Sequence, residues 1–287
     1  MVPISRRGFL RAARNMAIGG AIGALGVWRY VKFEAGWFQV SHHPVILAGL
    51  PNSFNGTTLA HLSDLHFSSW ITPERFSEVV DIVLALSPDL VAITGDFIDI
   101  RTDKSLIPQY IAQLSRLKAR LGVFAVLGNH DYWEDAGLVR KMLAESGITE
   151  LANRSARIDQ LGESFYLCGL DDYRENKQDL DALLADFPEG ERGILLLHEP
   201  DYADISGATG RFSLQLSGHS HGGQVYIPMF GPPVTPMYAE KYPRGMYRVE
   251  EMLLYTSSGI GMVRPFVRFN CRPEVALFTL LSAQEGT

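Results

Sequence analysis

The sequence predicts an α/β protein, because from residue 58 onward short apolar runs rich in β-branched residues alternate with longer segments of helical periodicity. A second observation supports this fold class: five of the apolar runs end in polar side chains, where open α/β sheets place their binding sites. A third is composition. The 287 residues are 46% hydrophobic and 20% charged, which suits a globular domain with a full core.

The first 32 residues are predicted to be a targeting segment. They hold six basic residues and no acidic residue: Arg6, Arg7, Arg11, Arg14, Arg29 and Lys32. The motif at 5–10, SRRGFL, resembles a twin-arginine export signal, and an uncharged run at 16–28 follows it. This run of 13 residues is short of the roughly 20 that span a bilayer. The alternative is an amphipathic first helix of the soluble fold.

Export by the twin-arginine route implies a location in the bacterial cell envelope. We expect residues 1–32 to be a cleaved signal or a membrane anchor, which leaves the protein periplasmic or anchored and facing outward. The expected partners of this segment are the twin-arginine export machinery and the membrane surface. Residues 33–56 are expected to connect it to a single catalytic domain at 57–287, because no linker divides the interior.

Charge argues against nucleic acid as a partner. The formal charge of the chain is −6, but without the six basic residues of the leader 20 basic residues face 32 acidic ones, about −12. Proteins that bind the phosphate backbone need clustered Lys and Arg.

The two cysteines, Cys168 and Cys271, show no CxxC spacing, so we expect small buried thiols, with a single bridge between them left open.

The elements follow in order along the chain. Buried strands are expected at 58–62, 90–94, 123–127, 194–197 and 212–216. A helix is expected at 73–86, with Thr72 as its N-cap and Pro73 in its first turn. Further helices are expected near 107–117, 138–146 and 180–185, and late strands at 224–227, 253–256 and 274–280.

Each of the five buried strands is followed by metal-type ligands. In chain order these are Asp64 and His66, then Asp96, then Asn129 with His130 and Asp131, then His198, and finally His219 and His221. A single Asp-x-His or Gly-Asp fragment is a weak signal, since short motifs often match by chance. The complete ordered set at the ends of five strands is a strong one. Gly95, Gly128 and Gly218 precede ligands and indicate either tight turns and close backbone approach or ordinary loops.

The ordered set D-x-H, G-D, G-N-H-D, H and G-H-x-H resembles the signature of the calcineurin-like metallophosphoesterases, and it is present without substitution. The resemblance covers nearly all of the chain after residue 51. It implies a four-layer α/β/β/α double β-sandwich whose second sheet includes the late strands. With the leader and the segment EAGWF at 34–38, the chain is similar to the YaeI/YkuE-type exported phosphodiesterases.

The resemblance also implies two divalent metal ions. Asp96 would bridge them, with Asp64, His66 and His221 on the first ion and Asn129, His198 and His219 on the second. Nitrogen and oxygen donors without thiolate favour Mn, Zn or Fe. Two carboxylates, one amide and four neutral imidazoles leave a net charge near +2, which attracts an anionic phosphate even in an acidic protein.

In the reaction that the resemblance implies, a metal-bridging hydroxide is the nucleophile. His130 would act as the acid or stabilise the transition state, as suits a group that titrates near neutrality. Asp131 is expected either to orient His130 or to be a solvated turn carboxylate.

The activity that these features favour is that of an envelope phosphodiesterase. Alternatives are a lipid pyrophosphate hydrolase of the UDP-2,3-diacylglucosamine type, a phosphomonoesterase and, more remotely, a non-catalytic metal-dependent scaffold. The aromatic residues Phe67, Trp70, Tyr132 and Trp133 and the Pro-rich stretch 227–247 either form an apolar wall for a lipid-bearing or aromatic leaving group or are ordinary packed residues.

Overall fold

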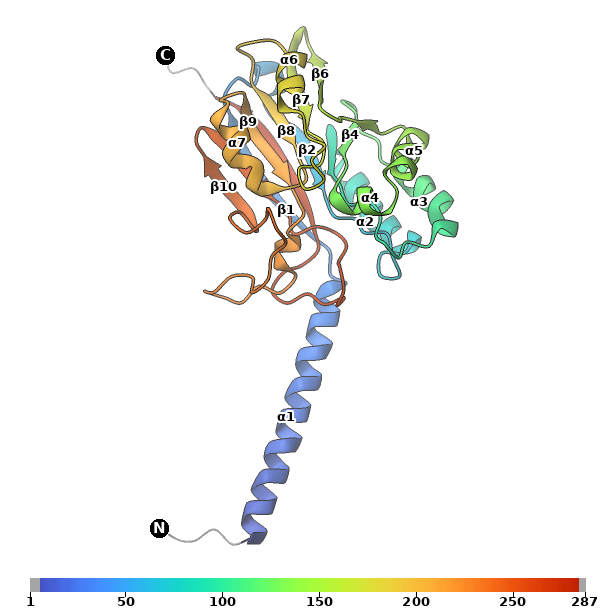
Figure 1. Cartoon of the computed structure of the whole chain (residues 1–287), viewed down its shortest axis with the longest axis vertical. Coiled ribbons are helices and arrows are strands. Elements are labelled where there is room, and N and C mark those ends of the chain that lie inside the picture. Colours follow the sequence, from blue (N-terminus) through green and yellow to red (C-terminus); the bar gives the residue numbers. More distant parts are fainter. Residues whose placement is uncertain (1–5, 284–287) are drawn as a thin grey trace.

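Two six-stranded sheets pack face to face in a computed structural model that describes residues 6–283 (Figure 1). The first sheet has the order β1-β12-β2-β3-β4-β5 and the second β10-β11-β9-β8-β7-β6. The first contains β1 (Gln39–Leu47), β2 (Thr57–Leu62), β3 (Leu90–Thr94), β4 (Val123–Val126), β5 (Thr149–Glu150) and β12 (Glu274–Ser282). The second contains β6 (Arg154–Gln160), β7 (Glu163–Gly169), β8 (Gly193–Leu196), β9 (Phe212–Ser217), β10 (Gly245–Val249) and β11 (Met252–Thr256).

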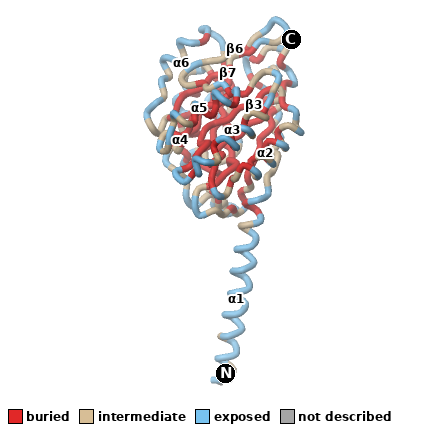
Figure 2. The backbone as a smooth tube through the Cα atoms, turned by 90° about the vertical axis from the view of Figure 1, so that its right-hand side faces the viewer, coloured by how far each residue is buried: buried red, intermediate tan, exposed pale blue. Residues whose placement is uncertain are grey.

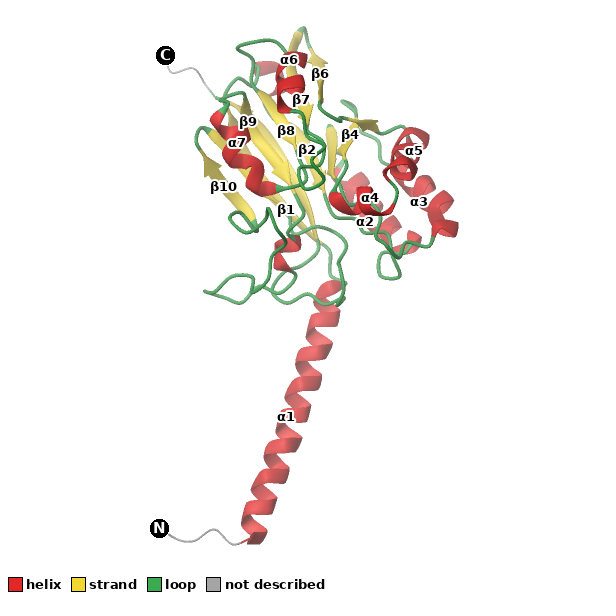
Figure 3. Cartoon of the chain, in the orientation of Figure 1, coloured by secondary structure: helices red, strands yellow, loops and turns green. Residues whose placement is uncertain are grey.

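Helices cover the outer faces of both sheets (Figure 3). They are α2 (Pro73–Leu86), α3 (Ile107–Leu114), α4 (Asn129–Glu134), α5 (Ala136–Ser146), α6 (Leu180–Asp186) and α7 (Ala203–Ala208). The first helix, α1 (Arg6–Ala35), covers neither sheet. Short 3-10 turns are η1 (Asn52–Phe54), η2 (Lys104–Leu106), η3 (Pro200–Tyr202) and η4 (His221–Gly223).

Apolar side chains on both faces of each sheet create the four layers. On β3, Val91 and Ile93 face the helices α2, α3 and α5, whereas Leu90 and Ala92 face the second sheet. On β8, Ile194 belongs to the core between the sheets, and its neighbours along the strand reach the α6 and α7 side. Because successive side chains of a strand point to opposite faces, each sheet needs a partner on both sides. The predicted four-layer α/β/β/α architecture is therefore confirmed.

The helix α2 has the bounds that the sequence predicts. Thr72 accepts a hydrogen bond from the backbone N–H of Arg75 at 3.4 Å, and Pro73 occupies the first turn. Its apolar stripe, including Phe76 and Val80, is fully buried against the first sheet. The helix ends where Ser87 takes a left-handed conformation, with φ of 47°.

Three expectations about the sheets are wrong. The stretch 274–280 does not join the second sheet, because β12 lies in the first, parallel to β1 and antiparallel to β2. The segment 33–56 is more than a connector, because it contributes β1 to that sheet. Residues 224–227 form only isolated bridges, in which Val225 pairs with Phe269 and Ile227 with Gly231. In each case the decisive pairing partner is distant in sequence or the pairing is too short to make a strand.

The helix α1 projects from one end of the domain, and nearly all of it is exposed (Figures 1 and 2). Of the expected export motif, Ser5 lies outside the described residues and the arginine pair lies in the first turn of α1. Only Glu34 and Ala35 at its C-terminal end are buried. Within residues 6–283 no helix combines the length and apolar character needed to cross a bilayer.

Candidate metal centre

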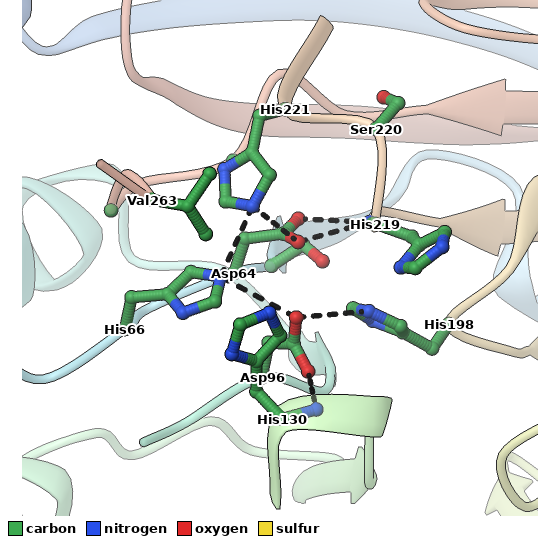
Figure 4. A network of polar contacts seen from close by, with 12 residues as sticks. Asp64, His66, Asp96, His130, His198, His219, Ser220, His221 and Val263 are labelled. Atoms are coloured by element: carbon green, nitrogen blue, oxygen red, sulfur yellow. Dashed lines mark hydrogen bonds and ion pairs between the residues drawn. The ribbon is translucent and has the colours of Figure 1, made fainter. Parts of the chain in front are cut away.

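The seven expected ligands all follow the carboxyl ends of parallel strands and meet at one edge of the sandwich. Strands β2, β3 and β4 of the first sheet lead into Asp64, His66, Asp96 and Asn129, and strands β8 and β9 of the second lead into His198, His219 and His221. Two hydrogen bonds join the sheets here, because the backbone N–H of His219 donates to the two carboxylate oxygens of Asp64 at 3.0 and 3.2 Å. The site therefore lies between the sheets (Figure 4).

The ligands fall into two groups that share Asp96. Ligand atoms of Asp64, His66, Asp96 and His221 lie within 4.8 Å of one another, and so do those of Asp96, His198 and His219. The first group contains the three residues expected on the first ion, and the second contains His198 and His219 of the three expected on the second, each together with Asp96. Asn129 is also buried, and neither its amide oxygen nor its amide nitrogen has a hydrogen-bond partner. An unpaired buried amide is costly unless another group satisfies it.

Close backbone contacts hold the ligand turns together. A Cβ atom on Gly218 would lie 1.8 Å from the Ser63 hydroxyl oxygen and 2.3 Å from an Asp64 carboxylate oxygen. On Gly128 it would lie 2.4 Å from a carboxylate oxygen of Asp96. These distances are far below van der Waals contact, so both positions need glycine. Of the two interpretations of these glycines, close approach is the one the structure supports.

The histidine tautomers fit metal binding. His198 Nδ1 lies 2.6 Å from the carbonyl oxygen of Thr94, to which it can only donate, so in the neutral ring Nε2 carries the lone pair. That Nε2 faces Asp96 Oδ2 at 3.2 Å. His219 Nε2 likewise donates to the Met237 carbonyl at 2.9 Å, which leaves Nδ1 as the acceptor. Lone pairs that converge on a carboxylate repel each other unless a cation lies between them, and a backbone carbonyl on the other ring nitrogen is the usual support of a ligating histidine.

His66 and His221 converge in the same way. Their Nε2 atoms lie 3.1 Å apart, and they approach Asp96 Oδ2 at 3.4 Å and Asp64 Oδ1 at 3.5 Å, respectively. Two imidazole nitrogens and two carboxylate oxygens therefore lie within 4.8 Å of one another. Such a nitrogen and oxygen donor set suits a first-row divalent ion.

Burial keeps two of the histidines neutral. It lowers the pKa of His219 to about 4 and holds the pKa of His221 well below the usual range. At His198 burial acts in the same direction, but the carboxylates of Asp96 and Asp64 outweigh it and raise the pKa well above the usual value. The buried carboxylates thus attract positive charge, which a divalent cation supplies without a proton.

His130 lies beside the metal-ligand cluster at the start of α4. Its ring packs edge-on against the His66 ring at a centroid distance of 4.7 Å. Its Nδ1 lies 3.7 Å from a carboxylate oxygen of Asp99. Burial lowers the pKa of His130, but the carboxylates of Asp96 and Asp99 outweigh this effect and raise it. The protonated ring, which can donate a proton, is thereby favoured.

Asp131 does not orient His130, contrary to one of the two expectations. Its Oδ1 accepts hydrogen bonds from the backbone N–H groups of Phe97 and Ile98, at 2.8 and 3.1 Å, and its Oδ2 accepts from Gly128 N–H at 3.0 Å. It is fully buried, so the solvated-turn alternative is also wrong. Its carboxylate instead ties the loop after β3 to the loop after β4. Asp99 takes the place beside His130, and the D-x-x-D spacing from Asp96 was the available signal.

A cavity of about 430 Å³ opens over the cluster. Asp96, Asn129, His130, His219 and His221 line its floor, and one wall is apolar: Pro233, Val234, Pro236, Val263, Pro265 and Val267. The Pro-rich stretch therefore contributes an apolar wall, in agreement with one of the two interpretations. The four aromatic residues do not line it. Phe67 is in the core, stacked on Tyr110.

Sequence reasoning missed the loop at 171–176. Glu199, which follows His198 and is fully buried, accepts hydrogen bonds from the backbone N–H groups of Tyr173 and Arg174, each at 3.1 Å. Arg174 lines the cavity, and its guanidinium lies over the Trp133 ring at 4.8 Å. A buried acid beside a ligand was a visible signal in the sequence, but its partner is 25 residues away from it.

Comparisons with known proteins agree with this geometry. A family model described as calcineurin-like phosphoesterase matches residues 57–223. Over 285 residues the chain is 32% identical to the uncharacterized metallophosphoesterase YkuE of Bacillus subtilis (strain 168). This match covers 98% of this chain and 99% of YkuE. The chain is also 31% identical over 285 residues to the phosphodiesterase YaeI of Escherichia coli (strain K12). This second match covers 97% of this chain and 100% of YaeI.

Proposed function

Because the chain belongs to the calcineurin-like phosphoesterase family and is a metal-dependent hydrolase of phosphate esters, we propose that it is an envelope phosphodiesterase that uses two divalent metal ions. The observation that carries this proposal is the pair of buried donor groups that share Asp96. One ion would be held by Asp64, His66 and His221 and the other by Asn129, His198 and His219. The donor set suits Mn, Zn or Fe.

The two ions, when bound, would supply Lewis-acid stabilisation of the phosphate oxygens and an activated water. The protein supplies the rest. His130 reaches the cavity floor, and the two neighbouring carboxylates outweigh burial and raise its pKa, so it serves as the acid that protonates the leaving oxygen or stabilises its developing charge. Asp99 positions the His130 ring from Nδ1. Arg174 presents a cation to the substrate from the opposite loop.

A diester substrate is supported by two observations. YaeI, which matches over its whole length, is named a phosphodiesterase. The cavity also offers an apolar wall beside the metal cluster, where the second ester group of a diester would fit. The same wall favours a lipid-linked pyrophosphate of the UDP-2,3-diacylglucosamine type as the second candidate. A phosphomonoesterase would use the same metal ligands, so substrate preference needs a direct measurement.

The envelope location is supported by the N-terminal helix. Its first turn carries the arginine pair, and up to residue 33 it contains no acidic residue. We therefore assign residues 1–32 to export by the twin-arginine machinery and to contact with the membrane surface. Because β1 pairs with β12, the catalytic domain of this proposal begins before residue 39.

Hydrolysis of bis(p-nitrophenyl) phosphate and p-nitrophenyl phosphate tests the function. The full chain is stripped of metal and reloaded with Mn, Zn or Mg, beside the variants His130→Ala, Asp99→Asn and His42→Ala. We expect Mn or Zn to restore diester hydrolysis. His130→Ala should then lower kcat by about 10²-fold to 10⁴-fold, as for loss of a general acid. Asp99→Asn should lower kcat by a smaller factor with KM unchanged.

The exposed His42, on β1, is the matched control and should leave both constants as in the wild type. Faster hydrolysis of the monoester than of the diester would exclude the phosphodiesterase. Folded protein that binds two ions per chain but cleaves neither compound would favour the lipid-linked pyrophosphate or the non-catalytic scaffold.

A further inference from the structure

The segment 227–237 exposes large apolar side chains although it belongs to the wall of the catalytic cavity. Met229 is 96% exposed, Phe230 82% and Val234 75%, with Ile227 and Met237 also exposed. From 227 to 239 the chain contains no charged residue. Soluble proteins rarely expose such a contiguous apolar stretch, and where they do it marks an interaction site.

This segment begins beside the base of α1. Tyr226 N–H donates to the Phe269 carbonyl at 2.8 Å, and Val225 forms a bridge with the same residue. The Phe269 ring in turn contacts the ring of Tyr30 on α1, with centroids 5.9 Å apart. Lys32 of α1 donates to the Phe266 carbonyl at 2.7 Å. The base of α1, the loop 263–272 and the segment 227–237 therefore form one continuous surface.

Figure 1 places this surface at the end of the domain from which α1 projects. Other exposed aromatic side chains lie there on and beside α1, among them Phe33 and Trp37. We name the segment 227–237, the loop 263–272 and residues 28–37 together the basal face.

Charge is distributed unevenly between the two ends of the molecule. Four basic residues of the basal face reach the surface, namely Arg29, Lys32, Arg264 and Arg272, whereas its Arg268 and its one acidic residue, Glu34, are buried. Four more basic residues, Arg6, Arg7, Arg11 and Arg14, are exposed further along α1. At the opposite end, around α6, residues 178–191 contain five acidic and no basic residues. An anionic surface would attract the basal face and repel the α6 end, so electrostatics alone would orient the molecule.

We propose that the basal face docks on an anionic lipid bilayer, with Met229 and Phe230 inserted among the lipid head groups. Apolar side chains without charge suit the headgroup and acyl boundary, and the surrounding Arg and Lys suit anionic head groups. The bilayer is the partner because it supplies both chemistries over an extended surface. The docked orientation presents the cavity mouth to the membrane, since Pro233, Val234 and Pro236 line the cavity within the inserted segment.

The orientation also identifies the substrate class, and this step rests on the proposed function. A phosphoester whose apolar part stays in the membrane would reach the metal cluster along the wall formed by 233–236 and 263–267. The substrate is therefore an amphiphilic phosphoester taken from the bilayer surface.

Vesicle flotation of the full chain tests the docking. The vesicles are made of phosphatidylcholine alone or with phosphatidylglycerol added, and the proteins are the wild type, the double variant Met229→Ser/Phe230→Ser and the control Leu161→Ser. Leu161 is 90% exposed in the turn between β6 and β7, at the end opposite α1, so it matches the exposure of Met229 without belonging to the basal face. Turnover of soluble bis(p-nitrophenyl) phosphate and the thermal unfolding midpoint are recorded for each protein.

We expect the wild type and Leu161→Ser to float with the anionic vesicles and much less with neutral ones. The double variant should bind roughly tenfold or more weakly, because two large apolar side chains no longer leave water. Its soluble turnover and midpoint should be unchanged, since neither residue lines the cavity. Equal flotation of the double variant and the wild type would show that α1 alone binds lipid and would overturn the proposal, as would a wild type that stays with the soluble fraction.

Docking and catalysis fail separately in this design. Vesicle binding with no turnover would remove the proposed function and keep the docking surface. Turnover of the soluble diester without vesicle binding would do the reverse. If both hold, a fluorescent phosphodiester lipid in the vesicles should be cleaved faster by the wild type than by the double variant.

Discussion

At the scale of single residues, the ligand cluster is built from strained backbone. Five of the seven expected ligands have positive φ angles: Asp64 at 53°, His66 at 43°, Asp96 at 55°, His219 at 67° and His221 at 51°. Each costs about 1 kcal/mol or more for a residue with a Cβ atom. Such strain persists where the surrounding structure requires it. Here the left-handed conformation turns side chains just past the end of a strand toward a common point. An extended backbone would instead point successive side chains to alternate faces.

Asp and His, like Asn, adopt this conformation more readily than most residues with side chains. The sequence shows the ligand types but gives no direct sign of the strain, because a left-handed residue within a D-x-H or H-x-H motif is set by the packing of the loop. The glycines at 95, 128 and 218 were the local indications that these turns are crowded.

A buried histidine outside the ligand set should make stability depend on pH. His61 on β2 is fully buried and hydrogen-bonded to the Thr94 hydroxyl at 2.8 Å. Burial, with the nearby His43, lowers its pKa from 6.5 to about 3. Between these values the unfolded chain binds one proton more than the folded chain, so the free energy of unfolding should fall as pH decreases from 6.5 toward 3, by about 1.4 kcal/mol per pH unit.

The measurement is urea unfolding of metal-stripped protein at several pH values for the wild type, His61→Gln and His42→Gln. The dependence below pH 6.5 should become shallower in His61→Gln, whatever that substitution costs at pH 8. The exposed His42 is the control and should keep the wild-type slope. An identical slope in all three proteins would refute the assignment to His61.

At the scale of elements, the ligand-bearing strands and the strands that complete the sheets behave differently. Strands β2, β3, β4, β8 and β9 were predictable, since each is a short buried apolar run bounded by turn residues. Strands β1, β6, β7 and β10 were not. Strand β1 alternates exposed and buried residues at its C-terminal end, and β6 has a single buried residue, so neither shows a continuous apolar run.

The pairing of β1 with β12 predicts where the domain can be cut. All nine residues of β1 pair with β12, and residues between 33 and 56 place Val45, Leu47, Leu50 and Phe54 in the core between the sheets. Burial of each such side chain contributes about 1.5 to 3 kcal/mol, so losing all four removes as much as the usual net stability of a domain. A chain that begins at residue 57 should therefore be insoluble or unfolded.

A chain that begins at residue 33 is the matched control, because it keeps β1 together with Glu34 and Ala35. It should be soluble and melt cooperatively near the midpoint of the full chain, as measured by circular dichroism. If the chain from residue 57 melted at the same temperature, β1 would be dispensable and the boundary that we infer would be wrong.

At the scale of the whole molecule, the cluster of candidate metal ligands joins the two sheets. The first sheet supplies Asp64, His66, Asp96 and Asn129, and the second supplies the remaining three ligands. Buried carboxylates and imidazoles of this kind repel one another or remain unpaired when no cation is present. Bound ions would therefore stabilise the packing of one sheet on the other as well as serve the reaction.

Metal removal should accordingly lower stability. At a free metal concentration a hundred times the dissociation constant, one site adds about 2.7 kcal/mol. For a domain of this size that corresponds to a midpoint roughly 5 to 10 °C higher. The measurement is thermal unfolding of stripped and Mn-reloaded protein, with hydrogen exchange of both forms.

Exchange should rise after stripping at residues 63–66 and 218–222, while the hairpin of β6 and β7, which carries no ligand, serves as the internal control. Equal midpoints for the two forms would contradict a metal link between the sheets.

The sequence by itself determined the family and the α/β class and predicted the candidate ligands, because strands, turns and ligand motifs are local and each is visible within a few residues. Only the tertiary structure decided that β12 lies between β1 and β2, that Asp99 rather than Asp131 faces His130, and that the loop at 171–176 brings Arg174 to the cavity. The physical reason is that these contacts join residues tens to hundreds of positions apart. Such pairings depend on how the two sheets pack as a whole, and no local pattern encodes them.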